Sequence, residues 1–264
     1  MEVKAENILV EVSKEIAKET YNDAAKPIIK PTGQIAGLVP RAIKAALLPV
    51  EKWILGKEYN LEKTKKLLEL KLEKINPELI ESPEPYIAVP AIQYISYCMD
   101  SEELRDMYAN LLANSMNKVV KNEVHPGFIE IIKQLSPDEA KILKKISIHK
   151  TIPVINVRYN NEKGEGVMVL NYFSDVGEKA NCENPMEIAS YFENMEKLGL
   201  IKVSEPYSSI VNKAIYEPLK NHKRIKELAQ IPSGFGDLNK VEIIEGYFTI
   251  TNFGEKFCKI CIRD

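Results

Sequence analysis

Apolar residues recur every three or four positions through the first half of the chain, and this spacing predicts amphipathic helices. The first helix should end near Lys26, before Pro27, and a second apolar stretch runs from Gly33 to Leu55. A third helix is expected from Asn60, a suitable N-cap. Its buried face would consist of Leu61, Leu68, Leu72 and Ile75.

The stretch from Asn76 to Pro90 holds four prolines and is predicted to be a linker. Asp100 should then open a long helix, because Glu103 follows three residues later in a variant of the capping box. The buried stripe expected for this helix is Leu104, Met107, Tyr108, Leu111, Ser115 and Val119.

Two further helix starts are predicted from caps followed by proline. A helix over 126–135 is followed by Ser136-Pro137-Asp138-Glu139, in which Ser136 would be the cap, proline the first helical residue and Glu139 the third. Asn184-Pro185-Met186-Glu187 repeats this pattern. The second of these helices should stop at Gly199, and it should bury Ile188, Phe192, Met195 and Leu198.

Apolar and polar residues alternate in the second half, which indicates strands. Residues 152–159 and 166–172 flank a polar turn and predict a β-hairpin, and two more strands are expected over 200–205 and 247–251. The fold class predicted is therefore α+β, mostly α. We expect a helical domain over 1–133 and a winged-helix-like domain over 134–264, with an insertion near 205–246.

The composition favours a globular protein that is not an enzyme. Hydrophobic residues make up 45% of the chain, charged residues 28%, and the formal net charge is −2. Three histidines and four cysteines leave little material for catalysis, a metal site or a cofactor site, and none of these is predicted. The N-terminus lacks a secretory signal and the cysteines are sparse, so a reducing cytoplasm is expected.

Cys258 and Cys261 have the one spacing typical of a metal or redox site. A zinc site needs four ligands and no second pair is present, so we interpret both cysteines as small buried hydrophobes. Among the histidines, His125 precedes Pro126 and should close a turn.

A nucleic-acid surface is the main alternative to a protein-binding surface. In a winged helix the recognition element would be the helix after Pro185, whose exposed residues would be Glu187, Ser190, Glu193, Asn194 and Lys197. This surface is slightly acidic and suits phosphates poorly. The basic residues of the insertion could instead contact the phosphate backbone or form a solvated helix face, and the candidates are Lys220, Lys223, Arg224 and Lys226.

The segment from Gly33 to Leu55 is the most unusual part of the sequence. Wound as a helix, it would place its few charges on one narrow stripe and leave a wide apolar arc. It is either the central helix of an α-helical core or a helix that can enter a membrane interface, which favours basic residues and tryptophan. The residues proposed to meet a membrane or a partner are Arg41, Lys44, Leu47, Leu48, Lys52 and Trp53.

Three stretches resemble the Abi-alpha (abortive infection alpha) domain family. They are residues 20–55, the motif ELRDMYANLLANSM over Glu103–Met116, and HPGFIEIIKQLSPDEAKIL over His125–Leu143. The resemblance covers roughly residues 15–220. It implies a bacterial protein of phage defence with a winged-helix-like tail, and it brings no catalytic residues with it.

These observations lead to one functional hypothesis and one alternative. The hypothesis is a non-enzymatic antiphage protein that acts by abortive infection through a protein partner or self-association. The winged-helix-like domain would receive a signal, and the helix over 33–55 would oligomerise or engage the inner membrane, which makes a peripheral membrane location an alternative to a purely cytoplasmic one. The alternative function is a winged-helix DNA-binding regulator.

Overall fold

The structure is a computed structural model that describes residues 66–263, apart from 99–100, 150, 205–208 and 232–233. The described residues fall into two compact units, which divide between Gln134 and Leu135. The expected helix before Lys26, the segment over 33–55 and the expected cap at Asn60 lie outside the described residues.

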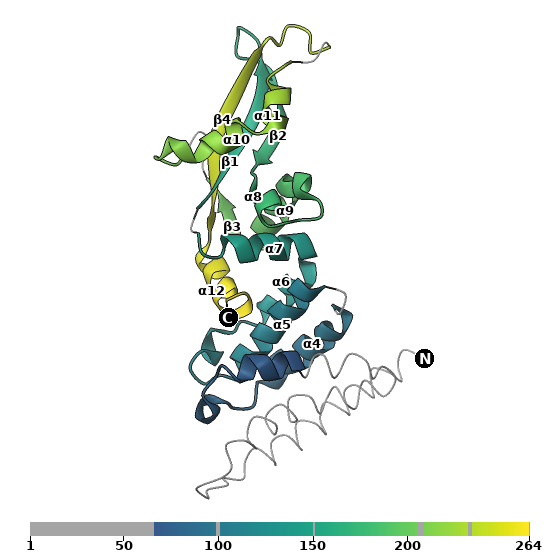
Figure 1. Ribbon diagram of the computed structural model, residues 1–264, viewed down its shortest axis with the longest axis vertical. Coiled ribbons are helices and arrows are strands. Elements are labelled where there is room, and N and C mark those ends of the chain that lie inside the picture. The colour runs from purple at the N-terminus through teal and green to yellow at the C-terminus, as the bar shows by residue number, and fades with distance from the viewer. Residues whose placement is uncertain (1–65, 99–100, 150, 205–208, 232–233, 264) are drawn as a thin grey trace, which may run out of the picture. The chain divides into compact units, whose positions relative to one another are not determined.

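The first unit consists of helices around a small apolar core (Figure 1). A helix over 66–72 is followed by the 3-10 turn η1 (Pro77–Leu79), α4 (Pro85–Tyr97), α5 (Glu102–Ser115), the 3-10 turn η2 (Lys121–Glu123) and α6 (Gly127–Gln134). Leu68 and Leu72 are fully buried, as predicted. The core cluster is completed by Ala88, Ile92, Leu112, Ala113 and Met116.

The proline-containing stretch 76–90 is the predicted linker only in part, since residues 76–84 connect two helices and residues 85–90 belong to α4. Pro85 occupies the start of α4, where the missing N–H has no intrahelical partner to lose, and Pro90 lies inside the helix. The helix persists across Pro90 because it buries an apolar face that includes Ile87, Ala91 and Ile95. Before α4, Ile80 pairs with Asn117 in an isolated antiparallel bridge, so this stretch is tied to the end of α5.

The helix predicted from Asp100 begins one position later than expected. Ser101 is the N-cap of α5, and its hydroxyl accepts a hydrogen bond from Leu104 N at 3.3 Å. Met107, Tyr108, Leu111 and Ser115 are buried as predicted. Val119 is 66% exposed because the helix ends at Ser115, one turn before it.

The second unit combines helices with a four-stranded antiparallel sheet. In chain order it contains α7 (Pro137–Ile146), β1 (Thr151–Asn160), β2 (Gly166–Phe173), α8 (Val176–Lys179), the 3-10 turn η3 (Pro185–Glu187), α9 (Ile188–Lys197), β3 (Ile201–Val203), the 3-10 turn η4 (Lys213–Tyr216), α10 (Glu217–Lys220), α11 (Lys223–Leu228), β4 (Lys240–Ile250) and α12 (Asn252–Cys261). The strand order is β2-β1-β4-β3. The fold class α+β is confirmed.

The predicted hairpin is confirmed, and β4 is longer than predicted. β1 and β2 pair around the turn at Asn161, and β1 pairs with β4 from Thr151↔Thr249 to Asn160↔Lys240. Residues 240–246, expected in the insertion, belong to β4. The insertion between β3 and β4 therefore consists of residues 204–239.

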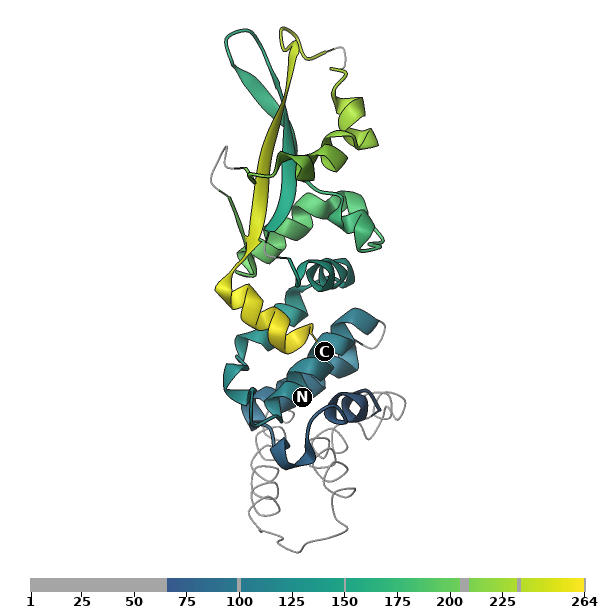
Figure 2. The ribbon, with the colours of Figure 1, turned by 60° about the vertical axis from the view of Figure 1, so that its left-hand side comes forward.

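β1 buries opposite faces in its two halves. Ile152 and Val154 are buried in the first half of the strand, residues 151–154, which we call the lower half. Ile155, Val157 and Tyr159 are buried in the second, upper half, residues 155–160. Successive side chains of a strand point to opposite sides, so the buried face changes between Val154 and Ile155. The upper residues pack against Tyr216, Leu219 and Ile225 of the insertion, which lies against the sheet (Figure 2).

The lower half of the sheet packs against α9. Phe192 of α9 lies 4.7 Å, centroid to centroid, from Phe248 of β4, which pairs with Ile152. Ile188, Phe192 and Met195 are buried as predicted, whereas Leu198 is half-buried. Gly199 ends the helix with a φ of 74°, a conformation that favours glycine.

Candidate functional site

The Ser-Pro-Asp-Glu sequence at the start of α7 is the centre of a buried polar network. Ser136 and Glu139 form the predicted capping box, with Ser136 N donating to Glu139 Oε2 at 2.6 Å. The other Glu139 oxygen accepts from Asn194 Nδ2 of α9 at 2.7 Å. Asn194, expected to be exposed on a recognition helix, therefore serves the fold.

Asp138 connects α7 to the loop before α9. Its carboxylate accepts hydrogen bonds from the backbone N–H groups of Glu183 and Asn184, each at 2.9 Å, and from the Tyr191 hydroxyl at 3.0 Å. Burial acts to raise the pKa of this carboxyl, but the hydrogen bonds from Asn184, Glu183 and Tyr191 outweigh it and hold the pKa below its usual value. The Asp138 carboxylate therefore binds groups of the protein itself, two of which are backbone N–H groups.

The predicted cap at Asn184 is wrong. Its side chain makes no capping hydrogen bond, residues 185–187 form a 3-10 turn, and α9 begins at Ile188. The N–H of Glu187, which the Asn184 side chain would bind as a cap, donates instead to the backbone oxygen of Asn184 at 3.1 Å, and the N–H of Asn184 is bound by Asp138.

The surface of α9 is acidic, as the sequence predicted. Glu187, Ser190, Glu193 and Lys197 are exposed. Two carboxylates against one ammonium group give this face a poor fit to phosphate groups.

The four basic residues proposed for nucleic acid differ in their contacts. Lys220 bonds to Glu245 at 2.9 Å and to Glu217 at 3.3 Å, and Lys223 lies 3.8 Å from Glu227. Arg224 Nη1 lies 3.1 Å from the sulfur of Met186. Lys226 is exposed on α11. Two of the four are therefore already paired with carboxylates.

His222 is a helix cap and a link between the insertion and α8. Its Nδ1 accepts a hydrogen bond from Arg224 N at 3.2 Å, and its Nε2 lies 3.0 Å from Glu178 Oε1. With Nδ1 accepting, Nε2 carries the hydrogen and donates to Glu178. The ring also packs on Phe173 at 4.8 Å. His125 closes a turn as predicted, since its Nδ1 accepts from Gly127 N.

Cys258 and Cys261 are buried, as interpreted from the sequence. Burial raises the pKa of the Cys258 thiol to about 12 and that of Cys261 well above its usual value. Within the described ranges, no group of three or more His, Cys, Asp or Glu side chains is arranged to hold a metal ion.

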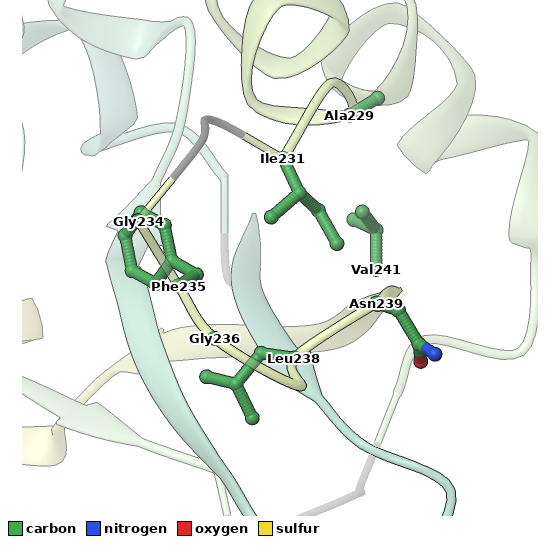
Figure 3. A pocket seen from close by; sticks show the side chains of 8 residues that line it. All are labelled: Ala229, Ile231, Gly234, Phe235, Gly236, Leu238, Asn239 and Val241. Atoms are coloured by element: carbon green, nitrogen blue, oxygen red, sulfur yellow. The ribbon is translucent and has the colours of Figure 1, made fainter.

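Two hollows lie along the insertion side of β4. The larger, of about 440 Å³, is surrounded by the apolar side chains of Ile231, Phe235, Leu238 and Val241, while the Asn239 amide points away from it (Figure 3). The smaller, of about 200 Å³, is lined by Ser209 and Lys213 and by residues 242–245 of β4. No sequence pattern predicts either hollow, because both depend on how the insertion returns to β4.

The membrane or partner candidates Arg41, Lys44, Leu47, Leu48, Lys52 and Trp53 lie outside the described residues. Among the helices that are described, none is long and apolar enough to cross a membrane.

A match over most of the chain decides the family of this protein. A family model described as "Abortive infection alpha" matches residues 56–261, which spans both units. The chain belongs to the abortive infection alpha family. The expected family membership is thus confirmed. Within the family motifs, Tyr108 donates to Ile129 O at 3.2 Å and Asp138 holds the loop before α9, so these motif residues stabilise the fold.

Other similarities add little to the family assignment. No curated protein matches the chain. A solved structure of an uncharacterized protein from the hydrocarbon-degrading marine bacterium Alcanivorax borkumensis SK2 is similar at 19% sequence identity, over 51% of this chain and 91% of that one, with a TM-score of 0.35.

Proposed function

We propose that this protein acts in defence against phage by abortive infection, and that it works through contacts with other proteins instead of catalysis. The observation that carries the proposal is the family match over residues 56–261, which covers parts of both compact units. The polar groups that would be the first candidates for chemistry have structural partners. Asp138 holds peptide groups, His222 caps α11 and Cys258 is buried.

The second unit is proposed to be a winged-helix-like module that binds a protein. In support, α7, β1, α8, α9, β3 and β4 follow one another in winged-helix order, β3 pairs with β4, and β4 pairs with β1. The insertion replaces the tip of the wing. Because α9 exposes Glu187 and Glu193, its surface favours a protein partner over DNA.

A phage challenge tests the defence role. Cells that express the chain should show reduced plaquing for at least one phage of a diverse panel, and infected cells should die before releasing progeny even at high phage excess. The control is Gly254→Ala, which should disrupt the fold for the reason given in the Discussion. Unchanged plaquing and survival across the panel would contradict the proposal.

The apolar segment over 33–55 is proposed as the effector, through oligomerisation or membrane engagement. Its single tryptophan, Trp53, is the only one in the chain, so intrinsic fluorescence reports on this segment alone. Vesicles with anionic lipids should shift the emission to shorter wavelength and leak, and Leu47→Lys should reduce both effects. If vesicles change neither the emission of Trp53 nor their own leakage, membrane engagement is contradicted and the interpretation as a core helix is favoured.

DNA binding is the second candidate function, favoured by the exposed Lys226 and Lys223 of α11. A regulator of this type would give a mobility shift that weakens steeply with salt and disappears in Lys223→Ala combined with Lys226→Ala. If the protein works through protein contacts instead, wild type and the double variant should give the same mobility shift.

A further inference from the structure

The outer edge of β4 is unpaired along half its length. β3 covers only the stretch from Phe248 to Ile250, and Ser204 N extends the pairing to Tyr247 O at 2.8 Å. In an antiparallel ladder, residues alternate between those that bond one neighbour and those that bond the other. Since Tyr247 bonds towards β3, the N–H and C=O groups of Val241, Ile243 and Glu245 point to the same side, where no described residue pairs with them.

β2 forms the opposite edge of the sheet, and it is also open. Asn161 N donates to Glu165 O at 2.9 Å, which fixes the alternation in this hairpin. Val167 therefore bonds towards Tyr159, and the backbone groups of Gly166 and Met168 point outwards. No residue in the described ranges pairs with them.

The chemistry of this edge is unusual for an unpaired strand. β2 has no charge and no proline over its eight residues, and Val167 and Met168 are 46% and 44% exposed. Edge strands are commonly protected from pairing with other chains by lysine, proline or bulges. β2 has two bulges, but both lie beyond Met168, so the stretch Gly166–Met168 stays regular and accessible.

The two edges lie at the same level of the sheet. Tyr159 pairs with Val167 on one side and with Val241 on the other. Both hollows described above adjoin the β4 edge, one at Val241 and the other at residues 242–245. An extended segment laid along this edge would therefore meet unpaired backbone groups beside a hollow that Phe235 and Val241 help to line, the combination of backbone pairing and side-chain pocket used in β-strand addition.

We propose that the segment added to the β4 edge is β2 of a second copy of this protein, so that copies join head to tail into a continuous sheet. β2 presents outward backbone groups and exposed apolar side chains that suit the hollow at Val241. Charge is consistent with this pairing. Strand β4 carries Lys240, Glu242 and Glu245, whereas β2 carries no charge, so β2 brings no like charge to the β4 edge.

The proposed contact between β2 of one copy and β4 of the next is small compared with the roughly 1,600 Å² of a standard protein interface. Association should therefore be reversible and concentration-dependent. Because the two surfaces differ, the contact does not close on itself, and growth beyond a dimer is expected. Sedimentation of the full chain over a range of concentrations should show an average mass that rises steadily.

Single substitutions at each edge test the two surfaces. Val167→Lys and Ile243→Lys should each abolish the rise in mass, since both positions are exposed and a charged lysine on an edge strand opposes the addition of another strand. Val119→Lys, at a position 66% exposed in the first unit, is the matched control and should assemble as wild type.

Mixing the two edge variants gives the sharpest result. The Val167→Lys protein keeps an intact β4 edge and the Ile243→Lys protein keeps an intact β2 edge, so an equimolar mixture should form a one-to-one dimer that neither forms alone. Assembly lost in Val167→Lys but kept in Ile243→Lys would mean a two-fold pairing of β2 edges and would overturn the proposal. Assembly kept in both variants, or a constant monomer mass in wild type, would also overturn it.

Hydrogen exchange tests the same contact without any variant. Peptides that cover Val241–Glu245 and Gly166–Met168 should exchange more slowly at high protein concentration than at low concentration. Exchange of both peptides that is independent of concentration would contradict the proposed contact.

Discussion

Tyr191 of α9 donates its phenolic hydrogen to Asp138 of α7 at 3.0 Å, and this bond joins two helices that are separated in the chain by the whole β-hairpin. The same carboxylate accepts two backbone N–H groups of the loop that leads to α9. Asp138 also accepts a hydrogen bond from Lys141 Nζ at 3.3 Å, so four donors converge on this carboxylate. The motif around Ser136 therefore specifies both a helix start and the position of a distant helix.

Replacing Asp138 should destabilise the second unit more than removing any one of its partners. We expect Asp138→Asn to lower the free energy of unfolding by about 2–3 kcal/mol, because buried backbone donors lose a charged acceptor, and Tyr191→Phe by about 1 kcal/mol. Urea unfolding followed by circular dichroism measures both. Lys145→Met, at an exposed position of the same helix, is the control and should change stability by less than about 0.5 kcal/mol. A larger effect of Tyr191→Phe than of Asp138→Asn would contradict this account.

Acid should unfold the protein partly through Asp138 and Glu245. Burial opposes ionisation of Glu245, but hydrogen bonds from Lys213 and Lys220 hold its pKa below the usual value, as other bonds do for Asp138. A carboxyl with a lower pKa in the folded state stabilises the fold above its unfolded pKa of about 4 and loses this contribution as pH falls through the folded pKa. Stability should thus decline from about pH 5 downwards. The decline should be shallower in Asp138→Asn, and an equal slope in both proteins would refute the assignment.

Two glycines make a matched test of backbone packing. A Cβ at Gly254 would lie 2.0 Å from Leu200 O, so Gly254→Ala must separate the start of α12 from β3 and should cost about 3 kcal/mol or more. Gly164 has a φ of 81° and no neighbour within 4 Å of such a Cβ, so Gly164→Ala should cost only about 1 kcal/mol of backbone strain. Thermal unfolding should show the difference. Equal costs would mean that α12 moves freely against β3.

The cysteines should differ sharply in reactivity. Cys258 and Cys261 are buried and poorly ionised, so alkylating reagents at neutral pH should leave both unmodified in the native protein and modify both in denaturant. Cys98 is half-buried and should react first in the native protein. Peptide mapping after timed alkylation measures each site. Native labelling of Cys261 as fast as that of Cys98 would show that the end of α12 opens.

Local patterns predicted those elements that local bonds define. The capping box at Ser136, the hairpin over β1 and β2, and the stop at Gly199 each depend on residues a few positions apart, and each was confirmed. Asn184 carries the same pattern as Ser136, yet its side chain makes no cap. Glu187 N donates to Asn184 O, and Asp138, distant in sequence, takes the Asn184 N–H that Glu187 would bind in a capping box. Helix α4 was missed for the opposite reason, since burial of its apolar face outweighs the proline at position 90.

The surfaces of the second unit were less predictable than its elements. The acidic character of α9 follows from the period of a helix and was predicted, except at Asn194, which Glu139 holds. The pairing of Lys220 with Glu245 requires the insertion to fold back on β4, and no spacing in the sequence encodes that return. The open edges at Met168 and Ile243 depend on the order of strands in the sheet, which alternation alone does not fix.

The change of buried face between Val154 and Ile155 makes the insertion an integral part of the domain. Excising residues 209–238 would uncover Ile155, Val157 and Tyr159 along a strand whose lower half still belongs to the folded remainder. Such a truncated chain would expose these three apolar side chains to solvent and would tend to aggregate. A shorter relative without the segment would need polar residues at the three positions. The insertion is therefore required by the fold, because the strand beneath it has apolar side chains that the insertion covers.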